Sequence, residues 1–143
     1  MPAFGEHALW FEFTSDRFDH SSSLPEHANA GNRFYGRDVA ELVATGLSER
    51  GFDTSFIDED WGWQVHAAAG DSTVVEISIY HNPEGDRARE DDWSFMVRSL
   101  RAERTLGMFK RFRELPVEAT SVAALEEVFA EIGVPLRAAP RSA

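Results

Sequence analysis

Residues 34–65 read FYGRDVAELVATGLSERGFDTSFIDEDWGWQV, and the rest of the chain is placed by how it packs on this segment. Its first half predicts an amphipathic helix, because apolar residues recur at spacings of three and four along one helical face. The apolar residues of that face are Tyr35, Val39, Leu42, Val43 and Leu47. The helix is expected to begin at an Asn32 N-cap and to end at Gly51 in the left-handed conformation. Gly46, inside the helix, is interpreted as a point of close contact with the sheet.

The second half of the stretch predicts two strands joined by an acidic turn. Residues 52–57 are rich in aromatic and β-branched side chains, and Asp58-Glu59-Asp60 ends that strand. Trp61, Trp63 and Val65 then alternate with other residues, which predicts a strand with both indole rings on the face toward the helix. We interpret the two rings as core anchors. The alternative is an aromatic platform for a ligand, which the intervening glycine would let approach closely.

The rest of the chain supplies three further strands and one further helix. The predicted strands cover residues 7–14, 72–81 and 93–98. A polar loop is expected over 16–32 and a short helical turn within 105–115. The second helix is expected to run from a Ser121 N-cap to Gly133 and to be followed by a frayed tail over 136–143. The element order βαββββα predicts a single α+β domain over residues 1–143. We expect a two-layer sandwich, with a mainly antiparallel sheet of about five strands and two helices on one face.

Composition limits the classes of function. The chain has 143 residues, no cysteine and a net charge of −11, so disulfides and thiolate sites are excluded. We expect a soluble cytoplasmic protein, because there is no secretory signal pattern and no apolar run near the ~20 residues that span a bilayer. The acidic charge argues against nucleic acid as a partner and is compatible with a basic protein partner.

Three segments together resemble a loose group of small uncharacterised bacterial α+β proteins. They are Glu49-Arg50-Gly51-Phe52, Asp58-Glu59-Asp60-Trp61-Gly62-Trp63 and Leu106-Gly107-Met108-Phe109-Lys110-Arg111. The resemblance implies a bacterial α+β domain and no known activity. It therefore provides no catalytic residues to carry over.

No pattern of residues indicates a catalytic, cofactor or metal site. The chain has no nucleophile elbow, no phosphate-binding loop and no dinucleotide fingerprint. The acidic turn Asp58–Asp60 lacks calcium-loop spacing, and the acidic and histidine residues of the 16–32 loop lack fixed ligand geometry. We therefore expect no cofactor and no metal. The alternative is a small hydrolase or ligand-binding enzyme that uses this turn with His66 or His81.

Strand alternation places a second set of side chains on the sheet face away from the helices. The candidate binding residues are Trp10, Gln64, His66, Tyr80, Met96 and Arg98. Trp, Tyr, Met and Arg are enriched in protein interfaces. We therefore predict a non-enzymatic bacterial protein-binding domain, an adaptor, inhibitor or immunity-type factor, which uses this face and an acidic surface. The same surface is also compatible with a homodimer. A further alternative is an acidic secretion chaperone, although the single strand predicted before the first helix fits that class poorly.

Basic residues are concentrated in one segment of this acidic chain. Residues 98–113 hold six of the 14 basic side chains, opposed only by Glu103. This strip could meet a phosphate-bearing ligand or the acidic turn of a second copy.

Overall fold

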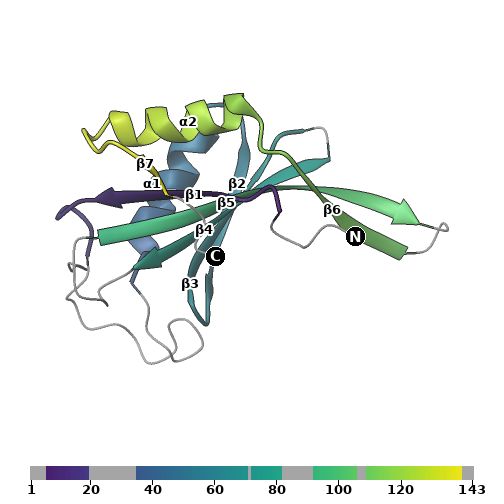
Figure 1. Ribbon diagram of the computed structural model, residues 1–143, viewed down its shortest axis with the longest axis horizontal. Helices are drawn as coiled ribbons and strands as arrows, with labels where there is room; N and C mark the ends of the chain where they lie inside the picture. The colour runs from purple at the N-terminus through teal and green to yellow at the C-terminus, as the bar shows by residue number, and fades with distance from the viewer. Residues whose placement is uncertain (1–5, 20–34, 71, 82–91, 106–108, 140–143) are drawn as a thin grey trace.

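The computed structural model describes residues 6–19, 35–70, 72–81, 92–105 and 109–139 (Figure 1). Within them, two helices and one seven-stranded sheet form an α+β fold. The elements are β1 (Leu9–Thr14), α1 (Arg37–Ser48), β2 (Asp53–Glu59), β3 (Gly62–Ala68), β4 (Thr73–His81), β5 (Asp92–Thr105), β6 (Phe109–Leu115), α2 (Ala119–Ala130) and β7 (Arg137–Ala139). No helix in this described part of the chain has the length and apolar character that crossing a bilayer requires.

The sheet is antiparallel throughout, and its order is β2-β3-β4-β5-β1-β7. The long strand β5 organises it, because β1 pairs with residues 92–97 of β5 and β6 pairs with residues 99–105 along the same edge. Residues 99–105 of β5 and the strand β6 form a hairpin that projects away from both helices (Figure 1). This hairpin is called the arm below.

The predicted α+β class and antiparallel sheet are confirmed, and the sheet of the described residues has seven strands where about five were expected. Within the segment expected to hold a short helical turn, residues 109–115 form a strand instead, because they pair with residues 99–105 of β5. Residues 106–108 lie outside the described residues. The apolar spacing in this segment is ambiguous locally, and long-range pairing decides its conformation. The predicted frayed tail likewise contains β7, which pairs with β1.

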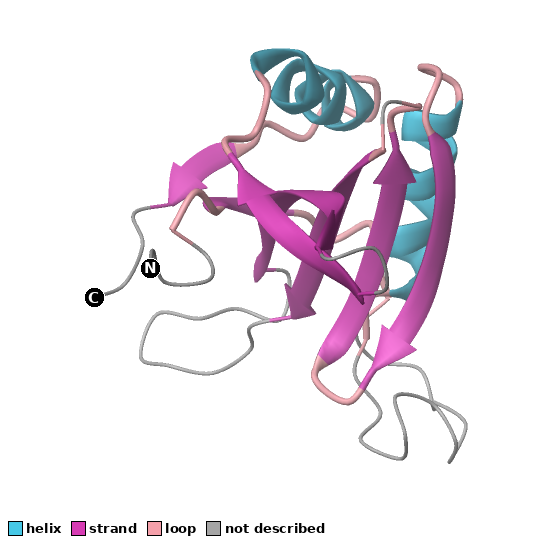
Figure 2. Cartoon of the chain, turned by 90° about the vertical axis from the view of Figure 1, so that its right-hand side faces the viewer, coloured by secondary structure: helices cyan, strands magenta, loops and turns pink. Residues whose placement is uncertain are grey.

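Both helices pack on one face of the sheet and share one core with it (Figure 2). The α2 residue Phe129 is fully buried between Phe13 of β1 and Phe95 of β5, with ring centroids 4.8 and 5.7 Å away. Phe18 also lies in this core at 5% exposure, although we expected residues 16–32 to be a polar loop. Leu9, in contrast, is 38% exposed at the margin of the face that it shares with Phe13.

The sequence predicted the C-terminal end of α1 correctly, but it did not predict where the two helices begin. Gly51 has φ +95°, and the amide of Phe52 donates to the carbonyl of Leu47 at 3.1 Å, so the predicted stop is confirmed. The helix starts differ, since α1 begins after Gly36, and Asn32 lies outside the described residues. The expected N-cap Ser121 is instead a buried residue inside α2, which begins two residues earlier at Ala119.

Gly46 brings the two helices together. A Cβ atom at this position would lie 2.5 Å from Cγ2 of Val128 on α2, so the expected contact with the sheet is wrong and the contact is with a helix. Beside it, Arg50 donates to the carbonyl of Gly46 at 2.9 Å and to carboxylates of Glu127 and Glu131 at 3.0 and 2.6 Å. The missing side chain of Gly46 therefore sets the close approach of α1 and α2.

Gly62 sets the close approach of β3 and β4. A Cβ atom here would lie 2.4 Å from the carbonyl oxygen of Ile79, so no larger residue fits without moving a strand. Trp63 follows it into the core at 8% exposure, as predicted. Trp61 does not enter the core, because β3 begins at Gly62 and Trp61 belongs to the turn before it. The ring centroid of Trp61 lies 4.9 Å from that of Tyr80. The expectation that both indole rings share the core face is wrong for Trp61.

Trp63→Ala is expected to lower the free energy of unfolding by about 3–5 kcal/mol, because it empties a buried indole site. Trp61→Ala is the matched control, since it removes the same side chain from a half-buried turn position and should cost less. Urea denaturation measures both losses. Equal losses for the two variants would contradict the assignment of Trp63 to the core.

Gly46→Ala is expected to destabilise the protein, although alanine is the better helix former by about 1 kcal/mol. The new methyl group would collide with Val128, whose branched side chain has little rotamer freedom. In a Val128→Ala background the same substitution should cost less or become stabilising. A double-mutant cycle by thermal melting tests this, and additive effects would show that Gly46 does not contact α2.

Candidate functional site on the open sheet face

The candidate site is the sheet face opposite both helices, called the open face below. Strand register aligns its side chains in rows that cross the sheet. One row is Ser55, His66, Glu76 and Arg98, and the next is Ile57, Gln64, Ser78, Met96 and Trp10. These rows combine charged, polar and aromatic groups on neighbouring strands.

Three aromatic rings lie side by side on this face. Trp61 comes from the β2–β3 turn, Tyr80 from β4 and Trp10 from β1, and all three are half-buried. The Tyr80 ring centroid lies 4.9 Å from that of Trp61 and 5.8 Å from that of Trp10, the second pair being stacked at 26°. Ser94, the small buried residue of β5 opposite Tyr80, leaves room for Tyr80 and Trp10 to meet across the strand. We call these three rings the aromatic row.

Tyr80 remains protonated to higher pH than a free tyrosine. Burial raises the pKa of the Tyr80 phenol, because the phenolate would lose hydration, and the nearby positive charge of Arg98 opposes that rise in part. The central ring of the aromatic row is therefore neutral at physiological pH.

A paired set of charges lies next to the aromatic row. Glu76 is 8% exposed and accepts two hydrogen bonds from Arg98, one of them from Nε at 3.0 Å. On its other side, His66 Nε2 lies 3.9 Å from the second carboxylate oxygen of Glu76. Gln64 donates to Ser78 at 3.1 Å in the following row. These cross-strand contacts hold the side chains of β3, β4 and β5 in place.

The six side chains predicted to bind do share the open face. Met96 and Arg98 lie on β5, and Trp10 and Tyr80 lie on the strands that flank it. Gln64 and His66 lie on β3, the next strand beyond β4, and all six side chains are half-buried. The prediction missed Trp61, because simple alternation with Trp63 assigned it to the core. The acidic residues just before it were the available signal, since a turn ends strand alternation.

The residues of the enzymatic alternative lie in different surroundings. Asp60 is exposed in the β2–β3 turn, and His66 faces Glu76 away from that turn. The His81 ring lies 4.5 Å from that of Trp93 and 5.7 Å from that of Tyr35. Among the described residues no group of three or more histidine and acidic side chains is arranged to hold a metal ion. His20, Glu26 and His27 lie outside those residues.

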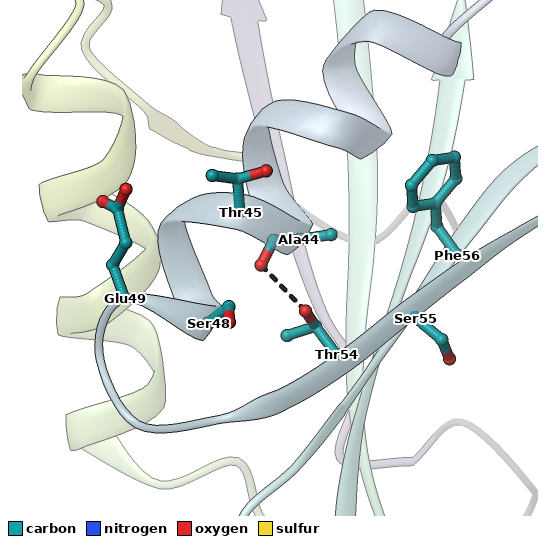
Figure 3. Close-up of a pocket in the computed structure, with 7 residues that line it drawn as sticks. All are labelled: Ala44, Thr45, Ser48, Glu49, Thr54, Ser55 and Phe56. Carbon is teal, nitrogen blue, oxygen red and sulfur yellow. Dashed lines mark hydrogen bonds between the residues drawn. The ribbon is translucent and has the colours of Figure 1, made fainter.

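Two surface grooves lie away from the open face. One, of about 390 Å³, runs between α1 and β2, with Glu49 at one end and Phe56 at the other (Figure 3). The hydroxyl of Thr54 donates to the carbonyl of Ala44 across its floor at 2.9 Å. The other, of about 480 Å³, lies where α2 ends, around Val134.

No protein-family model matches this chain, and no curated protein or solved structure matches it. The resemblance to small bacterial proteins therefore stays a prediction.

Arg98→Met is expected to lower the free energy of unfolding by about 3 kcal/mol, because it leaves the Glu76 carboxylate buried without its cation. The double variant Glu76→Met/Arg98→Met should recover most of that loss, since no buried charge remains. His66→Ala, which removes only a long contact, is the control. Chemical denaturation gives the values, and a double variant as unstable as the sum of its single variants would contradict the pairing.

Proposed function

We propose that this chain is a non-enzymatic protein-binding domain, of the adaptor, inhibitor or immunity type, which binds its partner through the open face. The aromatic row is the observation that carries the proposal. Three adjacent rings from separate segments provide a wide amphipathic surface, and such rings dominate the binding energy of protein interfaces.

The stacking of the rings supports a binding role in a second way. An isolated surface side chain loses rotamer freedom when a partner immobilises it, and that loss weakens binding. Tyr80 already contacts Trp61 and Trp10, and Arg98 is already held by Glu76. The face is thus ordered before the partner arrives, which favours a pre-organised interface.

The net charge favours a basic partner. At −11, the chain attracts positively charged proteins over long distances and repels polyanions. Such steering acts on the association rate, which should fall as salt rises while the dissociation rate changes little.

Trp10→Ala is expected to weaken partner binding by at least ~2 kcal/mol, about 30-fold, with little change in melting temperature. The wild-type chain and this variant serve as baits in lysate of the source organism, and calorimetry with the purified captured protein gives the affinity. Leu9→Ala is the matched control, because Leu9 is the exposed neighbour that points to the opposite face. Equal capture by wild type and Trp10→Ala, or unfolding of Trp10→Ala, would refute the proposal.

A further inference from the structure

We infer a second interaction surface, separate from the open face: the free edge of β2 receives the arm of a second copy of this chain. In this head-to-tail contact, β6 of one copy extends the sheet of the next copy beyond β2. Four features of the described residues support it: an unpaired edge, a groove beside that edge, opposite charges, and an exposed aromatic ring on the arm.

The strand β2 is an open edge. It is the outermost strand of the sheet and, in the described part of the chain, pairs only with β3. One side of its backbone therefore has amide and carbonyl groups that an added strand can use. Ile57 of β2, whose side chain belongs to the open face, is 45% exposed, so apolar surface continues from that face to this edge.

The groove between α1 and β2 runs along this edge (Figure 3). Thr54 and Phe56 line it from the strand, and Thr45 and Ser48 line it from the helix. A strand added to β2 would direct alternate side chains toward this groove. The edge thus combines backbone pairing with a site for side chains.

The charge of this edge selects a basic strand. Between residues 49 and 60 there are five acidic residues, namely Glu49, Asp53, Asp58, Glu59 and Asp60. The one basic residue in that range is Arg50, which is bound to Glu127 and Glu131. An acidic strand, including β2 of another copy, would be repelled.

The arm has the opposite charge. Residues 99–115 contain five basic and two acidic residues, whereas the remainder of the chain contains nine basic and 23 acidic residues. Arg101 and Arg113 are cross-strand partners and both are exposed, an arrangement of like charges that an acidic surface would stabilise. Glu103 lies 3.5 Å from Arg113.

The arm also presents a free edge and an aromatic ring. Within the described residues β6 pairs only with β5, and Phe112 of β6 is 61% exposed. The strands β2 and β6 are each seven residues long, so they match in length. Pairing of β6 with another β6 would bring basic strands together, so charge favours the β6–β2 contact.

Sedimentation and light scattering of the purified chain test this contact without any outside partner. At low ionic strength the wild type should have a mass above that of the 16.1 kDa chain, and in about 1 M salt, which screens charges beyond ~3 Å, it should approach that mass. A wild type that stays monomeric at low salt and high concentration overturns the inference. Trp10→Ala should self-associate like wild type, which separates this test from the proposed function.

Two complementary variants test the head-to-tail geometry. Phe112→Ser/Arg113→Glu damages the arm, and Glu49→Lys/Asp53→Lys damages the edge, so each variant alone should be monomeric. Their equimolar mixture should form a 1:1 dimer, because one variant retains a working edge and the other a working arm. The control is Asp16→Lys/Glu126→Lys, which makes the same change in net charge as the edge variant but at exposed sites elsewhere. This control should still self-associate. Variants that fold yet fail to form the mixed dimer, or that each assemble alone, overturn the inference.

Discussion

The contact between Gly62 and the carbonyl oxygen of Ile79 is the constraint on which the two faces of this sheet depend. A Cβ atom would lie 2.4 Å from that oxygen, so β3 and β4 can take this spacing only because residue 62 has no side chain. Immediately after it, Trp63 enters the core, where its ring lies against Gly36. Immediately before it, Trp61 turns onto the open face and meets Tyr80. One glycine therefore separates an indole that is buried in the core from an indole that lies on the open face.

The packing of the helices has a consequence for the open face. Because Gly46 lets α1 approach Val128 of α2, both helices fit on the same side of the sheet and share one core. The aromatic row is built on the other side of strands whose inner residues, such as Ile77 and Phe95, are fully buried. A packed core restrains those strands, and the Glu76–Arg98 pair restrains side chains above them. These restraints support the proposed pre-organised interface.

Local sequence patterns were sufficient for part of this structure. Alternation assigned Trp10 and Tyr80 to the open face, because each follows or precedes residues that must enter the core. Helical periodicity predicted both helices, and the glycines that follow them predicted their C-terminal ends. The same reasoning failed where distant contacts decide: β6 forms because β5 offers an edge, and β7 forms because β1 does. The partner of Gly46 was also beyond reach, since nothing near it in the sequence distinguishes a neighbouring helix from a sheet.

Trp61 and Trp63, two residues apart, lie on opposite faces of the sheet, and Trp61 continues the aromatic row through Tyr80 to Trp10. The most direct test is the nuclear Overhauser contacts between the aromatic protons of these rings in the wild-type protein. We expect contacts from Tyr80 to both Trp61 and Trp10, and contacts from Trp63 to Phe56. Contacts from Trp61 to Phe56 or to α1 residues, with none to Tyr80, would place both indoles in the core and contradict their assignment to opposite faces.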